Sequence, residues 1–261
     1  MRRPTFFRPL AKIFLASVLL PFPARPDGGP TASLRLSEPV RSADDYYLGR
    51  QNLANVQRGL QLLRQRVVKE PSDYEAWWRI AKFVNYQARH APDDQRLSIL
   101  AEGVNAGRRA VALAPARVEG HFWLGANLGL SAEEGSFLRG ISLIDNIRRE
   151  MEIVNQIDPD YEQASGLRTL ARVDFRAPFF KGGNKRRSVE QLERCLTRFP
   201  DNSLTMLYLA ESYLAVGLRD EARKQLESIL TLCPDPVYGP ELADNQSEAR
   251  RMLAEEFHSG K

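Results

Sequence analysis

Prolines recur along this chain at nearly regular distances. Pro71, Pro115, Pro159, Pro200 and Pro234 are separated by 44, 44, 41 and 34 residues. Proline ends helices, and a period of this size is typical of helical repeats in which each unit buries its apolar face against the next. The spacing therefore predicts an all-α solenoid of stacked helix pairs. Such arrays present extended binding surfaces, so we expect a binding protein and not an enzyme.

The last interval has the residue spacing of a tetratricopeptide repeat (TPR), a helix hairpin of about 34 residues. Large and small side chains occupy the required positions, which are Met206, Leu209, Ala210, Tyr213, Ala222, Leu226 and Pro234. Gly217 can supply the turn inside the hairpin. We therefore predict one hairpin over 203–231 and, by the same frame, about five helix pairs with a capping helix over 244–257.

The three earlier intervals exceed the nominal repeat by about ten, ten and seven residues. We place this surplus between the two helices of each pair, which predicts three enlarged hairpin tips at one edge of the stack. Phe137, Phe175, Phe179 and Phe180 would lie on these tips.

The N-terminus has a different character. Four basic residues precede or begin the apolar run 13–22, as in an export signal. We expect residues 1–24 to be this signal, either cleaved or kept as a membrane anchor, followed by a flexible linker over 25–41 and the solenoid over 42–261. The basic leader accounts for the net charge of +4. The remaining chain is near neutral, so we expect no nucleic-acid partner.

Chemistry-bearing motifs are scarce. The three histidines, His90, His121 and His258, do not form a metal-binding motif, and no nucleophile motif is present, so we expect no catalytic residue, metal or cofactor. Cys195 and Cys233 fall near the ends of second helices in neighbouring pairs. They are either two buried free thiols or, in an exported protein, a disulfide.

The first helix of each pair lines the concave groove of a TPR stack, and its groove face can be read from the repeat frame. The positions are Glu75, Trp78, Lys82, Asn85 and Tyr86, then Glu119, Phe122, Ala126, Gly129 and Leu130, then Gln163, Gly166, Leu170 and Val173, then Leu204, Leu207, Glu211 and Leu214. Most are apolar, which predicts a groove for an apolar guest. Alternatively, the protein's own helices fill the groove as ordinary core.

Three segments resemble the TatT family, the TPR-repeat T-components associated with tripartite ATP-independent periplasmic (TRAP) transporters. The segments are 120–129 (GHFWLGANLG), 147–151 (IRREM) and 178–185 (PFFKGGNK). The resemblance implies an exported, often lipid-anchored helical protein that partners a periplasmic solute-binding protein and holds a hydrophobic small molecule in its lumen. The first cysteine is Cys195, so no lipobox cysteine follows the signal, and we expect a periplasmic protein, soluble or tethered by an uncleaved signal.

Polar residues near these segments could orient a guest. Asn127 and Lys185 are candidates, whereas His121 occupies a packing position and suits a core histidine better. The predicted ligand- or partner-binding residues are Trp78, Lys82, Asn85, Tyr86, Phe122, Asn127, Leu170, Leu207 and Lys185. Lys185, Arg186 and Arg187 form either a solvated tip or a docking patch.

Two functions follow from these patterns. The first is an adaptor that holds a hydrophobic ligand, or an apolar segment of another exported protein, in its groove. The second is an assembly scaffold that docks partners through enlarged hairpin tips and binds no small molecule. Self-association is compatible with either function.

Overall fold

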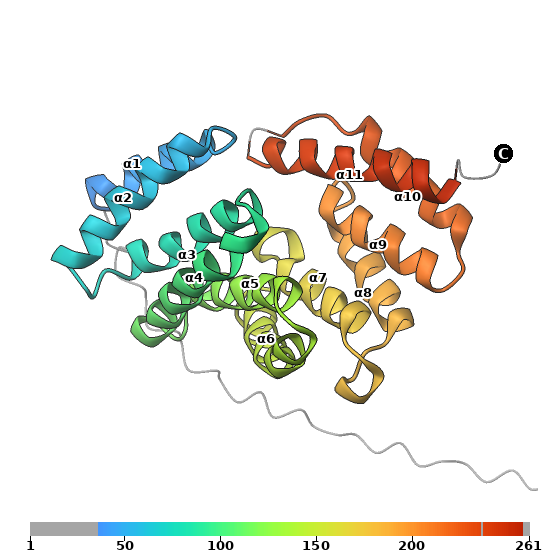
Figure 1. Ribbon diagram of the computed structural model, residues 1–261, viewed down its shortest axis with the longest axis horizontal. Helices are drawn as coiled ribbons and strands as arrows, with labels where there is room; N and C mark the ends of the chain where they lie inside the picture. The colour runs from blue at the N-terminus through green and yellow to red at the C-terminus, as the bar shows by residue number, and fades with distance from the viewer. Residues whose placement is uncertain (1–35, 236, 258–261) are drawn as a thin grey trace, which may run out of the picture. The chain divides into compact units, whose positions relative to one another are not determined.

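A computed structural model of the chain describes residues 36–235 and 237–257, and its elements there are helical (Figure 1). They are α1 (Glu38–Leu48), α2 (Leu53–Lys69), α3 (Tyr74–Arg89), α4 (Asp93–Leu113), α5 (Val118–Glu134), α6 (Phe137–Ile157), α7 (Tyr161–Arg176), the 3-10 helix η1 (Phe179–Lys181), α8 (Lys185–Arg198), α9 (Ser203–Ala215), α10 (Arg219–Thr231) and α11 (Gly239–Phe257). None of these helices is long and apolar enough to cross a bilayer. The leader expected over 1–24 lies outside the described residues.

The helices pair in chain order, from α1 with α2 to α9 with α10. First helices of successive pairs also contact one another, as α3 does with α5 and α7 with α9. This arrangement confirms the predicted solenoid of five pairs with α11 as its cap. The hairpin over 203–231 is confirmed, and Gly217 makes its turn at a φ of 85°. The helical region starts at Glu38, inside the segment expected to be a linker.

The prediction of three enlarged tips is wrong for two of the pairs. Only three residues join α3 to α4 and only two join α5 to α6, because α4 and α6 each extend to 21 residues. The surplus therefore lengthens the second helices there. Only the connection between α7 and α8, residues 177–184, is enlarged, and it contains η1.

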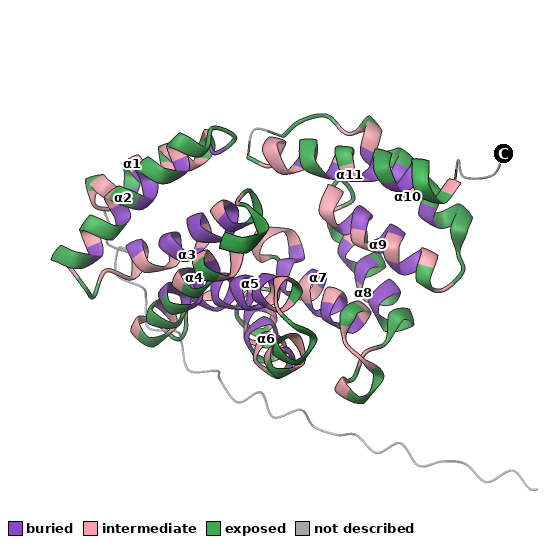
Figure 2. Cartoon of the chain, in the orientation of Figure 1, coloured by how far each residue is buried: buried purple, intermediate pink, exposed green. Residues whose placement is uncertain are grey.

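Glycine allows the helices to approach closely in the middle of the stack. A Cβ at Gly107 would lie 2.8 Å from the Cα of Leu124, so α4 can meet α5 only without a side chain at this point. A Cβ at Gly125 would lie 2.2 Å from the terminal methyl of Met151 on α6. The buried side chains follow these contacts along the inner faces of the pairs (Figure 2).

The cysteines do not form a disulfide. Cys195 is buried in the core, where burial raises the pKa of its thiol, and Cys233 is exposed just after α10. The prediction of two buried thiols is therefore correct for Cys195 and wrong for Cys233.

His121 joins α5 to α6 inside the core. Its Nδ1 lies 2.7 Å from Oε2 of Glu150 and its Nε2 lies 2.9 Å from the carbonyl oxygen of Pro115. Both partners are acceptors, so the ring makes both hydrogen bonds only as an imidazolium, which donates from each nitrogen. The hydrogen bond with Glu150 raises the pKa of His121, although burial opposes the shift. His121 is thus the core histidine that its repeat position favoured.

This pair makes stability depend on pH. Because the pKa of His121 is higher in the folded protein than its unfolded value of about 6.5, its contribution is complete below that pH and is lost as the pH rises through the folded pKa. Urea unfolding should be measured at several pH values, from below the unfolded pKa of His121 to above its folded pKa. The free energy of unfolding should fall as the pH rises. His121→Ala should lower the free energy of unfolding by about 3 kcal/mol at acidic pH and flatten the slope, because it removes the closest partner of the buried Glu150 carboxylate and leaves only Arg149 at 3.5 Å. Arg64→Ala, which removes an exposed ion pair and no histidine, is the control. An unchanged slope in His121→Ala would contradict this assignment.

Candidate binding cavity

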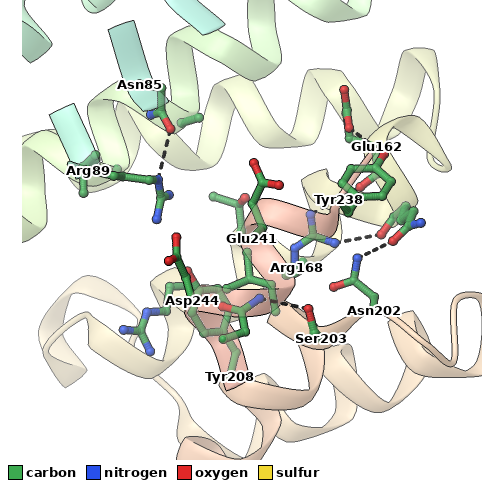
Figure 3. Close-up of a pocket in the computed structure, with 18 of the residues that line it drawn as sticks. Asn85, Arg89, Glu162, Arg168, Asn202, Ser203, Tyr208, Tyr238, Glu241 and Asp244 are labelled. Carbon is green, nitrogen blue, oxygen red and sulfur yellow. Dashed lines mark hydrogen bonds between the residues drawn. The ribbon is translucent and has the colours of Figure 1, made fainter. Parts of the chain in front are cut away.

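A cavity of about 1200 Å³ lies on the concave side of the stack. Its walls come from the first helices α3, α5, α7 and α9, from α6, from the end of α1 and the turn after it, and from the C-terminal ends of α8 and α10 with the segments that follow them, including the start of α11. Figure 3 shows that Tyr208 and Tyr238 approach it from the C-terminal repeats and Asn85 and Arg89 from α3. The space is therefore shared by repeats that are far apart in the sequence.

Aromatic rings form much of the cavity wall. Tyr47 and Tyr86 meet edge to face with ring centroids 6.1 Å apart, and Phe122 and Trp123 do so at 4.8 Å. Rings placed in this way are large apolar surfaces with a fixed orientation. This part of the wall suits an apolar or aromatic guest.

Lys82 adds a cation to the aromatic wall. Within the described residues its ammonium group has no carboxylate partner or hydrogen-bond acceptor and lies 4.2 Å from the ring centroid of Tyr47. Desolvation lowers the pKa of Lys82, with the nearby charge of Glu162 opposing the shift. The ring stabilises the cation only in part, so an acceptor on a guest would be bound favourably here.

Arg168 lies at the base of the cavity and is 8% exposed. Its guanidinium donates to the carbonyl oxygens of Gln163 at 2.8 Å and Glu162 at 3.3 Å, and no ion pair links it to an acid among the described residues. Burial lowers its pKa. A buried guanidinium held by backbone oxygens keeps an uncompensated charge toward the cavity.

The backbone that Arg168 binds is strained. Glu162, Gln163 and Ala164 have φ values of 46°, 58° and 59°, so three consecutive residues with side chains adopt the left-handed conformation. This costs on the order of 1–2 kcal/mol per residue. Tyr238 and Asn202 offset part of the cost, because they donate hydrogen bonds to the side chains of Glu162 and Gln163. The strained turn is thus fixed by residues of the cavity wall (Figure 3).

Arg50 connects the beginning of the solenoid to its end. It is 2% exposed, pairs through two nitrogens with the carboxylate of Glu241 and donates to the carbonyl oxygen of Val237. Its guanidinium also lies 4.7 Å from the ring centroid of Tyr47. The turn after α1 is thereby held beside the start of α11 (Figure 1). We call these contacts, together with the pair between His90 and Asp244 at 3.4 Å, the latch.

The latch should control how readily the C-terminal segment opens. Arg50→Ala removes charge-assisted hydrogen bonds worth about 1.5–3 kcal/mol each, so amide hydrogen exchange over 237–245 should accelerate at least about tenfold. Mass spectrometry of deuterated peptides measures this rate. Arg64→Ala is the control, because it removes an exposed pair with Glu102. Equal exchange rates in both variants would show that the latch does not hold the C-terminal segment closed.

Some of the predicted binding residues lie together at the cavity, and the others lie elsewhere in the structure. Lys82, Asn85, Tyr86 and Phe122 line the cavity. Five lie elsewhere: Trp78 donates to Glu75 on α3, Asn127 is fully buried, Leu170 and Leu207 belong to the core, and Lys185 is exposed at the start of α8. The side-chain amide of Asn127 donates hydrogen bonds to the carbonyl oxygens of Ala81 and Trp123. It therefore has no donor left for a guest.

The groove is less apolar than its repeat positions indicate. Cavity-lining residues that the frame did not single out include Tyr47, Arg50, Trp123, Glu162, Arg168, Arg172, Tyr208, Tyr238, Glu241 and Asp244. Several are charged, and Arg172 pairs with Glu133 and Glu211. In the described residues no three His, Cys, Asp or Glu side chains gather as a metal site. The geometry is that of a binding cavity with aromatic walls and a few fixed charges.

Comparisons with known proteins agree with this architecture. Residues 204–236 match the tetratricopeptide repeat family. The solved structure of TTC0263, a TPR protein of Thermus thermophilus, superposes with a TM-score of 0.61 at 19% identity, covering 82% of this chain and 97% of the other. The chain has the fold of a tetratricopeptide-repeat solenoid. The type IV pilus biogenesis factor PilW has the same TPR-like fold, with a TM-score of 0.55, 13% identity and coverage of 87% and 97%.

A second family matches the first part of the chain. Residues 40–168 match the family described as regulator of microtubule dynamics protein 1-3. The match begins within α1 and ends at Arg168 in α7, just after the strained turn. The sequence has no significant similarity to a curated protein. At these identities the solved structures indicate the fold alone.

Proposed function

We propose that the protein is an exported TPR adaptor that holds a hydrophobic ligand, or an apolar segment of a partner protein, in its concave cavity. The observation that carries this proposal is the volume of about 1200 Å³ with rings of several repeats on its wall. Ligand sites in proteins commonly have volumes of about 300–1,000 Å³ and combine apolar walls with a few polar groups, so this cavity is large enough for a sizeable guest. Lys82 and Arg168 would orient the polar end of the guest.

The sequence also supports a cellular location for this function. The apolar leader supports export, and the resemblance to TRAP-associated proteins supports a periplasmic solute-binding protein as the partner. TPR proteins typically bind other proteins, which agrees with an adaptor role. The alternative, a scaffold that docks partners only through its tips, has less support because one enlarged tip is present and not three.

Gly129 offers a way to obstruct part of the cavity without disturbing the fold. It lies on α5 at the cavity wall, and a Cβ built on it meets no atom within 4 Å. Gly129→Leu should stabilise the helix by up to about 1 kcal/mol while its side chain enters the cavity. We expect the variant to bind the fluorescent probe 8-anilinonaphthalene-1-sulfonate at least about tenfold more weakly than the parent, because the probe needs the same apolar wall.

The matched control is Ala215→Leu, which adds an equal side chain at an exposed position on α9. It should leave probe affinity unchanged. Thermal unfolding of both variants shows that the fold is retained. If Gly129→Leu binds the probe as well as the control does, the cavity is not the binding site and the proposed function fails.

A further inference from the structure

The enlarged connection between α7 and α8 exposes two aromatic side chains. Phe179 and Phe180, in η1, are 91% and 71% exposed. Single exposed apolar residues are common on proteins, but two adjacent phenylalanines with almost no protein contact leave a large apolar surface in water. We call residues 176–187 the tip.

The tip is held in place by its backbone and by α6. Gly182 adopts a φ of 77°, and a Cβ at Gly183 would lie 1.9 Å from the carbonyl oxygen of Ala177, so both positions require glycine. Arg148 on α6 and Arg187 on α8 each donate to the carbonyl oxygen of Gly182. The two phenylalanines are therefore presented by an ordered turn.

Positive charge surrounds the two rings. The tip contains no acidic residue and five basic ones, Arg176, Lys181, Lys185, Arg186 and Arg187. Lys181 pairs with Asp145 and Arg187 with Asp174, while Arg186 is exposed and makes no ion pair among the described residues. An apolar point within a basic surround is complementary to an anionic lipid surface, where rings enter the interface and cations remain at the headgroups.

We propose that the tip is a membrane-docking site that inserts Phe179 and Phe180 into the interface of a bilayer rich in anionic lipid. A small convex turn favours this partner over a protein, because a specific protein interface buries about 800 Å² on each side. Phe179 and Phe180 do not line the cavity, although the first three residues of the tip, Arg176 to Pro178, do.

A position-specific label tests the proposal in the full-length chain. Cys233→Ser removes the exposed thiol, and Cys195 is buried, so a nitrobenzoxadiazole label can be attached at Phe180→Cys alone. With phosphatidylglycerol vesicles its emission should shift to the blue and strengthen, and with pure phosphatidylcholine vesicles it should change much less. The same label at Val68→Cys, an 81% exposed site on α2, should show no shift and thus excludes adsorption through other parts of the chain.

Two paired variants measure the energetic contributions through vesicle co-sedimentation of the full chain. Lys185→Glu with Arg186→Glu should weaken binding to phosphatidylglycerol vesicles at least about tenfold, since each surface cation contributes about fivefold. Phe179→Ser with Phe180→Ser should weaken it by a similar factor, and Leu48→Ser with Val68→Ser, which changes two exposed apolar residues on α1 and α2, should not. The proposal is overturned if the label at 180 stays silent, if both labels respond alike, or if both tip variants bind as the control does. If the label at position 180 does not respond to vesicles, a protein would be the better candidate partner for the tip.

Discussion

The cavity depends on the ion pair between the buried guanidinium of Arg50 and the partly exposed carboxylate of Glu241. A TPR stack needs only contacts between neighbours, so nothing in the repeat frame requires its first turn to meet its last helix. Here a guanidinium that is almost completely excluded from water is satisfied by a carboxylate and a carbonyl oxygen 191 and 187 positions further along the chain. If those partners moved away, Arg50 would be left with the carbonyl oxygen of Tyr47. Leaving the buried guanidinium without its carboxylate is costly, and this cost favours the closed form of the cavity.

The same C-terminal segment fixes the strained backbone on the opposite wall. Tyr238 follows Val237 in the chain, and its hydroxyl group donates to Glu162 within the left-handed turn. Arg168 holds the carbonyl oxygens of that turn. The contact of Arg50 with Val237 and the conformation of residues 162–164 are therefore coupled, because Val237 and Tyr238 are adjacent in the chain. Strained backbone is commonly found where binding sites need preorganisation.

Repeat architecture could be predicted from the sequence because it is encoded locally, in proline spacing and in small and large residues at fixed positions. The lengths of α4 and α6 could not be, since a surplus of ten residues can extend a helix as well as a loop. The face of α7 could be predicted only in part. Gln163 and Val173 line the cavity as the repeat frame predicts. Arg168 and Arg172 line it as well and Leu170 is core, because the left-handed turn over 162–164 interrupts the regular helix on which the frame relies. The role of Arg50 could not be predicted from any sequence pattern, because its partners Val237 and Glu241 are distant in sequence.

The central claim is that the cavity holds a guest, and native mass spectrometry of the full-length protein, purified gently from its own cells, tests it most directly. The account predicts a bound species of defined mass with about one copy per chain, released when the protein unfolds. Its polar end should fit beside Lys82 and Arg168 and its apolar part beside Tyr86 and Phe122. A protein that is empty of small molecules and of partner segments in every preparation would contradict the account.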